Sequence, residues 1–290
     1  MMTTEQSRHR NLVAGLCSVL AFLLLLAAAF SAILRFTVFS PTYYRSIVCS
    51  DAYTDAVIRS LEEKSEAECL YFGFPEDTFT PLFSADKVKL DALNYADELK
   101  GYLINGDPLS DSVYCEAEIF ATVTELCGAE DMDAVREITD EIADEFKASV
   151  RPVSFEGALH TARTAFFDNK AVRVFSKMYV PFFLPAAMLL LLVYRGKKDS
   201  DRYGGGAGVL FAACAVVFVP TACLKVYDLP TRLVLAPSPF ASFVKGAIGG
   251  IVDFAFDFSL IAFSAATAVL IISVVYFVLK QEKSRTTEQA

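Results

Sequence analysis

Residues 178–194 read MYVPFFLPAAMLLLLVY and are followed at once by Arg195, Gly196, Lys197 and Lys198. The first seventeen residues carry no charge, whereas four basic side chains lie between Arg195 and Arg202. A long uncharged apolar stretch is typical of a helix that crosses a membrane. Because cytoplasmic loops of membrane proteins are enriched in Lys and Arg, the basic segment predicts which side of the membrane the other parts of the chain occupy.

Three other apolar segments accompany this one, at 11–34, 203–224 and 258–279. A helix needs about 20 apolar residues to cross the hydrocarbon core of a bilayer. Each of these three segments reaches that length without help from neighbouring residues. The segment 178–194 is shorter, but the mostly apolar residues 171–175 precede it, and Lys177 can extend its amine toward water. We therefore predict an all-α protein with four transmembrane helices. The first is too long for the apolar part of a signal peptide, about 7–15 residues, which favours an uncleaved anchor.

Basic residues gather on one side of the predicted spans. Arg8 and Arg10 precede the first span, and three basic residues follow the last one between Lys280 and Arg285. The positive-inside rule therefore places 1–10, 195–202 and 280–290 in the cytoplasm, with both termini on that side of a plasma membrane. Segment 35–177 is then expected as an extracytoplasmic domain. Segment 225–257 is expected as an apolar outer loop that lies on the bilayer or caps the bundle.

The charge of the chain is unevenly placed. Residues 35–173 hold 27 acidic and 13 basic side chains, a net charge of −14, whereas the remainder has a net charge of +5. Such an acidic domain argues against nucleic acid or anionic lipid as a partner of this surface. The ordinary explanation is a solvated acidic face.

The pattern of apolar residues within 35–177 predicts a helical bundle with no sheet. Ser50 or Asp51 and then Ser84 are the expected caps of two helices, the second ending at Asn105-Gly106. A third helix is expected between Pro108 and Gly128, a fourth follows it, and a fifth is expected over 154–167. The inward positions predicted for the first four are Tyr53, Val57, Ile58, Leu61; Val88, Leu93, Ala96, Leu99, Leu103; Val113, Ile119, Phe120, Val123, Leu126; and Val135, Ile138, Ile142, Phe146.

Four of the seven cysteines lie in this domain, and the others lie in spans. Cys115 and Cys127 are expected on one helix, about 18 Å apart at 1.5 Å per residue, which is too far for a disulfide. Any disulfide should therefore join Cys49 or Cys69 to Cys115 or Cys127. Four free thiols are the alternative.

Few residues have the spacing of known chemistry. The segment 105–116 has an acidic residue at each expected end of a calcium loop, but Pro108, Leu109 and Ser110 break the required pattern, so no metal site is predicted. No phosphate-binding or other cofactor motif is present, and no cofactor is predicted.

Asp253 and Asp257 form the more informative pair, because side chains four residues apart share one face of a helix. Carboxylates at membrane depth normally face a partner. One interpretation is an interfacial ion-pair network with Lys177, Lys225 or Arg35. The other is a catalytic or proton-transfer site that includes His160, the single histidine beyond the N-terminal tail. Both carboxylates are expected to turn toward the bundle.

Prolines 181, 185 and 220 fall within the predicted spans, in the halves that the orientation places outward. Because proline can kink a helix away from its neighbours, these positions, the two aspartates and the apolar loop together predict a cavity that opens outward.

The whole layout resembles that of four-span bacterial membrane proteins that include the lipoprotein intramolecular transacylases. Phe39-x-x-x-Tyr43 and Leu99-x-x-Tyr102-Leu103-x-x-Gly106 are similar in style to that family's outer segment, and His160 could match its outer histidine. The resemblance covers the topology of the whole chain but only short patches of sequence. That family's second outer loop carries a histidine and a tryptophan, which 226–250 lacks, and its outer domain is shorter. The resemblance therefore implies the architecture and not the activity.

Two functions follow as hypotheses. The first is a non-enzymatic envelope protein of a bacterial plasma membrane, whose acidic domain binds a partner or ligand. The second is a membrane-embedded acyltransferase or other enzyme that acts on a lipid-linked substrate at the outer leaflet through His160 with Asp253 or Asp257. A transporter is disfavoured, because only four spans and no internal repeat are present.

Overall fold

The computed structural model describes residues 4–109, 114–128, 131–151, 157, 160–196, 202–235 and 238–288. Its regular structure in these ranges is helical, with no strand. The chain divides into two compact units, which are described separately. The spanning unit comprises Met1–Phe39, Arg173–Leu229 and Ile251–Ala290, and the acidic unit comprises Ser40–Val172 and Pro230–Gly250.

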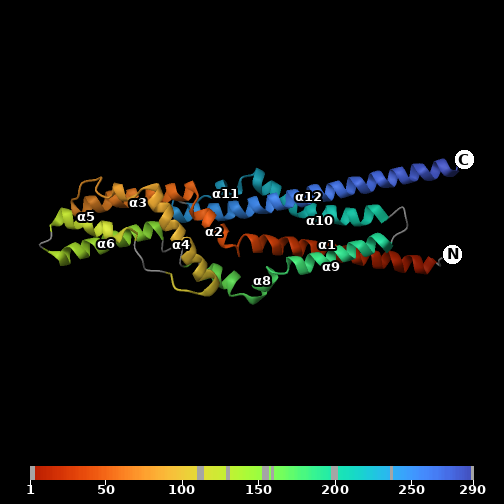
Figure 1. The fold of residues 1–290 in the computed structure, drawn as a ribbon, viewed down its shortest axis with the longest axis horizontal. Coiled ribbons are helices and arrows are strands. Elements are labelled where there is room, and N and C mark those ends of the chain that lie inside the picture. The colour runs from red at the N-terminus through yellow and green to blue at the C-terminus, as the bar shows by residue number, and fades with distance from the viewer. Residues whose placement is uncertain are drawn as a thin grey trace. The chain divides into compact units, whose positions relative to one another are not determined.

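The spanning unit is built from four long helices that run side by side (Figure 1). They are α1 (Thr4–Phe36), α9 (Tyr179–Gly196), α10 (Arg202–Val226) and the part of α12 (Pro239–Glu288) that follows Gly250. Short α8 (Lys170–Phe175) precedes α9. Within the described ranges, three segments are long and apolar enough to cross a membrane: Leu12–Phe36, Gly206–Val226 and Pro239–Leu279. These confirm three predicted spans as helices and indicate a multi-pass membrane protein. The apolar part of α9, Tyr179–Val193, is shorter.

The segment 225–257 differs from the predicted loop. It contains the four-residue helix α11 (Leu229–Arg232), and α12 has already begun at Pro239. The hydroxyl of Ser238 accepts a hydrogen bond from the backbone N–H of Ala241 at 3.1 Å and so caps the helix. A proline in the first turn of a helix loses no intrahelical hydrogen bond, since that N–H has no partner there. Pro239 is therefore compatible with the first turn of α12, within the segment that was predicted as a loop.

The acidic unit contains the first four helices predicted from residue periodicity. They are α3 (Asp51–Phe72), α4 (Ala85–Asn105), α5 (Glu116–Cys127) and α6 (Met132–Val150). The helix α2 (Pro41–Val48) and the short helical turns η1 (Thr80–Leu82) and η2 (Arg163–Phe167) complete it, and α2 was not predicted. The Ser50 and Ser84 side chains accept hydrogen bonds from the N–H groups of Tyr53 and Lys87, as expected of caps. Part of the fifth predicted helix, 154–167, lies outside the described residues.

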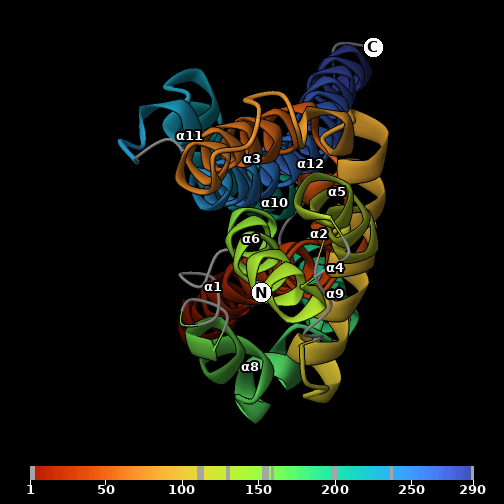
Figure 2. The same cartoon turned by 90° about the vertical axis from the view of Figure 1, so that its left-hand side faces the viewer.

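Apolar side chains of all these longer helices meet in one core. Helix α4 crosses α3, α5 and α6 steeply instead of running along them (Figure 2). The largest fully buried side chains of this core are Val48, Tyr53, Val57, Leu61, Phe79, Val88, Leu99, Ile119, Val123, Ile142 and Phe146. Two predicted inward positions are wrong, because Leu93 and Leu126 are 38% and 43% exposed. Val113 lies outside the described residues.

The first turns of α12 pack closely against α2 within the acidic unit. A Cβ atom added at Gly250 would lie 2.7 Å from Cε2 of Tyr43. One added at Gly246 would lie 3.0 Å from Cγ2 of Ile47. The Tyr43 hydroxyl donates a hydrogen bond to the carbonyl of Ala247. Glycine is therefore kept in this helix because the neighbouring side chains occupy the space of a Cβ.

Arg151, whose side chain is mostly buried, lies at the C-terminal cap position of α6. Arg151 lies 3.1 Å from the carboxylate of Glu98 and 3.8 Å from that of Asp91, and its guanidinium lies over the ring of Tyr95. Burial raises the pKa of Asp91, nearby Glu98 raises it further, and Arg151 opposes the shift. The cluster ties the end of α6 to α4.

Candidate functional site

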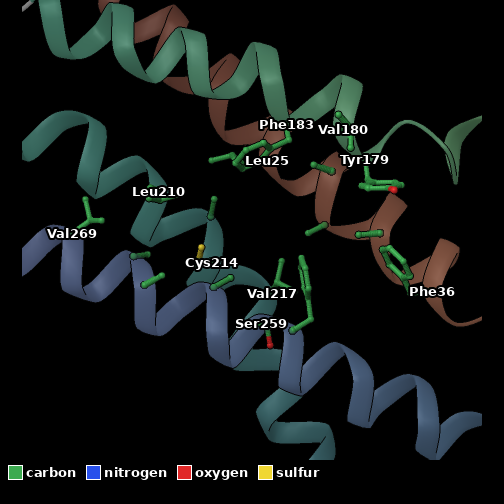
Figure 3. A pocket seen from close by; sticks show the side chains of 18 residues that line it. Leu25, Phe36, Tyr179, Val180, Phe183, Leu210, Cys214, Val217, Ser259 and Val269 are labelled. Atoms are coloured by element: carbon green, nitrogen blue, oxygen red, sulfur yellow. The ribbon is translucent and has the colours of Figure 1, made fainter.

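An apolar cavity of about 500 Å³ lies among the four helices of the spanning unit. The side chains of α1 and α9 face those of α10 and α12 across it (Figure 3). The lining residues are Leu25, Ala28, Ala29, Ala32 and Phe36 of α1; Tyr179, Val180 and Phe183 of α9; Leu210, Ala213, Cys214 and Val217 of α10; and Phe258, Ser259, Ala262, Ala265, Ala266 and Val269 of α12. None of the three prolines, the two aspartates or the residues of 225–257 from which a cavity was predicted is among these lining residues, so the predicted outward-opening cavity stays a prediction.

Small side chains make the room for this cavity. Seven of its eighteen lining residues are alanines, and an alanine leaves the space that a larger apolar side chain would fill. Other contacts hold the helices of the spanning unit together. The rings of Phe218 and Phe263 stack with centroids 4.9 Å apart between α10 and α12. The Ser31 hydroxyl donates to the carbonyl of Phe175, which ties α1 to the chain before α9.

Polar atoms are few in the lining. The Ser259 hydroxyl is 3.0 Å from the Thr221 hydroxyl and 3.0 Å from the carbonyl of Phe256, so protein groups already satisfy it. The hydroxyl of Tyr179 has no hydrogen-bond partner within the ranges that the structure describes. Its ring packs against Phe36 with centroids 5.6 Å apart. Tyr179 therefore offers a polar group at one end of an otherwise apolar space.

The two aspartates singled out from the sequence differ in their surroundings. The amine of Lys225 lies 3.1 Å from Oδ1 of Asp253 and 4.7 Å from the ring centroid of Phe256, so one of the predicted basic partners is confirmed. Asp257 is exposed, and within the described ranges no ion pair joins it. Both side chains are largely exposed, and at about 100° per residue Asp257 lies on a different face of α12 from the cavity lining. The expected inward orientation of both carboxylates is therefore wrong.

His160 belongs to the acidic unit, while Asp253 and Asp257 belong to the spanning unit. The imidazole is exposed, and the backbone carbonyl of His160 accepts a hydrogen bond from the Thr164 hydroxyl. A site that combines this histidine with either carboxylate stays a prediction.

All seven cysteines are free, so the cross-link expected as one of two alternatives is not formed. Cys115 precedes α5 with a left-handed φ of 51°, and Cys127 ends that helix, as their predicted separation requires. Burial raises the pKa of the thiols of Cys49, Cys69 and Cys115, which makes them poor nucleophiles.

The alanines of the cavity were missed by sequence reasoning, because alanine in an apolar span is ordinary. One signal is visible afterwards. Ala28 and Ala32 on α1, and Ala262 and Ala266 on α12, are four residues apart and so share a helix face.

Comparison of the chain with protein-family models, with curated proteins and with solved structures finds no match. The resemblance to the four-span transacylases therefore stays a hypothesis.

Proposed function

We propose that this multi-pass membrane protein holds the apolar chain of a lipid or lipid-linked molecule in the cavity between α1, α9, α10 and α12. The cavity carries this proposal. Its volume of about 500 Å³ falls within the range of roughly 300–1,000 Å³ of small-molecule sites. Such sites combine an apolar lining with a few polar groups that orient the ligand, and Tyr179 is a group of that kind.

The composition of the lining selects the ligand. A water molecule needs two to four polar partners to occupy a cavity, and this lining offers almost none outside Tyr179 and Ser259. A flexible hydrocarbon chain fits between alanine-lined walls without an unsatisfied polar group. Each methylene group that it buries contributes about 0.8 kcal/mol relative to water.

Filling the cavity tests the proposal. Ala29 and Ala262 line it without being fully buried, so the double variant Ala29→Leu/Ala262→Leu adds side-chain volume with little strain elsewhere. Ala268→Leu is the matched control, because Ala268 is an exposed alanine of α12 that is not among the lining residues. Native mass spectrometry of the detergent-extracted protein should show several-fold less bound lipid in the double variant only. Equal lipid in all three proteins would refute the cavity as the binding site.

The proposed orientation has both termini in the cytoplasm and 36–176 outside a plasma membrane. The basic residues around 195–202 support it through the positive-inside rule. In a variant whose seven native cysteines are replaced by serine, an impermeant thiol reagent should fail to label Ser200→Cys in intact cells and should label it after permeabilisation. Labelling in intact cells would reverse the topology.

A second candidate is an enzyme that acts on a lipid-linked substrate, for which His160, Asp253 and Asp257 would carry the chemistry. The cavity favours it too, because such an enzyme must hold an acyl chain. The exposed carboxylate of Asp257 directly precedes the lining residue Phe258. His160→Ala and Asp257→Asn should then leave the amount of bound lipid unchanged and alter its chemical form, as lipid mass spectrometry would reveal.

A further inference from the structure

Two large apolar side chains near the C-terminal end of α3 are exposed on the surface of the acidic unit. Leu70 is 85% exposed and Tyr71 is 72% exposed, although they lie in the acidic unit and outside the apolar segments long enough to cross a membrane. Cys69 just before them is fully buried, and Phe72 just after them is half-buried. Adjacent exposed aliphatic and aromatic groups are typical of a contact surface, because soluble surfaces seldom keep such groups together.

A ladder of aromatic rings holds Tyr71 in place. The Tyr71 ring lies 4.8 Å from that of Phe72, and the ladder continues through Phe74 to Phe79 with centroid distances of 5.9 and 6.3 Å. Phe79 is fully buried and packs against Phe146 in the core, at 5.7 Å. The surface ring is therefore fixed before any partner arrives, which lowers the entropy lost on binding.

The chain turn at Gly73 makes this ladder possible. Gly73 ends α3 with a left-handed φ of 72°, and the N–H of Phe74 donates to the carbonyl of Cys69 at 2.8 Å. This turn reverses the backbone and brings Phe74 back beside Phe72. Leu70 and Tyr71 are thus presented on a rigid corner and not on a loose loop.

Carboxylates border the same corner. Glu66, Glu68, Glu76 and Asp77 lie within six residues of Leu70 or Tyr71. Burial, and then the neighbouring Glu145 and Glu141 of α6, raise the pKa of Glu68, so carboxylates of α6 also lie near Glu68. Lys64 is the cation that opposes this shift, and it already pairs with Glu145. The corner therefore carries an apolar centre and an excess of negative charge.

We propose that this corner, formed by Leu70 and Tyr71 with the bordering carboxylates Glu66, Glu68, Glu76 and Asp77, binds a protein segment whose apolar side chains are flanked by Lys or Arg. Tyr71 packs against the apolar side chains, and the carboxylates pair with the basic ones. A second copy of the corner would bring like charges together, and an anionic bilayer would be repelled. This surface is distinct from the lipid cavity, and its function does not depend on lipid binding.

A random peptide display library, selected against the full-length protein in neutral phosphatidylcholine nanodiscs and counter-selected on empty nanodiscs, tests the proposal. Enriched peptides should combine apolar residues with Lys or Arg. Tyr71→Ser should weaken their binding by at least about tenfold, as loss of an aromatic hot spot does. Glu76→Gln/Asp77→Asn should weaken it mainly at low salt. Leu90→Ser is the control, since Leu90 is 62% exposed on α4 of the same unit and should bind peptides as the wild type does.

Four outcomes would overturn the proposal. They are no enrichment over empty nanodiscs, enriched peptides without basic residues, binding that Tyr71→Ser leaves unchanged, and a change in the oligomeric state of the protein on Tyr71→Ser, which would identify a second copy as the partner. Because Leu70 and Tyr71 are exposed, their substitution should leave the thermal unfolding of the protein unchanged, and loss of binding is then not a loss of folding.

Discussion

The two units use the same apolar residue types in opposite ways. In the acidic unit Leu61 and Leu99 are fully buried, and polar side chains cover the surface around them. In the spanning unit Leu191 and Leu192 are 62% and 59% exposed, while alanines such as Ala266 face the interior. Water drives leucine inward, whereas a bilayer accepts it outside and leaves interior contacts to small residues. A large apolar residue therefore indicates a buried position in the acidic unit, whereas in the spanning unit it can equally lie on the outer surface.

Truncating one leucine in each unit should give the largest difference in the free energy of unfolding. Leu99→Ala should lower the free energy of unfolding by about 2–5 kcal/mol, because it leaves a cavity in a closed core. Leu191→Ala should change it by less than about 1 kcal/mol, since lipid fills the space that the side chain leaves. Denaturant titration of the detergent-solubilised protein, followed by circular dichroism and tyrosine fluorescence, measures both. Equal losses would show that Leu191 packs against protein after all.

A glycine pair gives a smaller contrast. Gly250→Ala should destabilise the protein by roughly 1–3 kcal/mol, because the new methyl group overlaps the ring of Tyr43. Gly208→Ala in α10 meets nothing within 4 Å and should be neutral or stabilising by up to about 1 kcal/mol through helix propensity. Thermal unfolding of the two variants in parallel gives the comparison. Destabilisation by both would mean that both helices are closely packed at glycine.

The smallest expected effect is the pH dependence of the acidic unit. The raised pKa of Asp91 means that its ionisation opposes folding. The contribution of Asp91 to the free energy of unfolding is most favourable at a pH below its pKa in the unfolded chain, about 3.9. This contribution declines as the pH rises to the higher pKa of the folded state. The stability of Asp91→Asn relative to wild type should therefore increase with pH across this window and then level off.

Asp51→Asn is the control for that experiment. Lys89 lies 2.9 Å from the carboxylate of Asp51 and lowers its pKa, so this ionisation favours folding. The stability of Asp51→Asn relative to wild type should decrease as the pH rises from the lowered folded-state pKa to the unfolded value of about 3.9, and should level off above it. Urea titrations at a series of pH values measure both slopes, and slopes of one sign for the two variants would contradict this account.

Periodicity and capping residues predicted most of the helices of the acidic unit. Ser50, Ser84 and Gly106 mark predicted ends that the structure confirms, since each satisfies or turns the backbone locally. Leu93 and Leu126 were misplaced because helical spacing gives one apolar face but not how far the neighbouring helices extend over it. The start of α12 at Pro239 was missed because 225–257 was predicted as a loop, although proline is common in the first turn of a helix.

The candidate site was less accessible to sequence reasoning. Asp253 and Asp257 attracted attention as charges near a span, yet one is paired with Lys225 and both are exposed. The cavity depends on where four separate helices leave a gap, and no local pattern encodes that distance. The prolines that led to a predicted cavity are not among the lining residues, and the alanines that line it look like ordinary residues of an apolar helix.

The short apolar part of α9 has a consequence for the membrane itself. Tyr179–Val193 extends only about 22 Å at 1.5 Å per residue, against roughly 30 Å of hydrocarbon. Under the predicted four-span arrangement, a bilayer beside α9 must become thinner or admit polar side chains to its interior, and either adjustment carries an elastic energy that grows with the mismatch. The protein should therefore partition toward thin membranes, and short acyl chains should collect around α9 as a boundary layer of distinct composition.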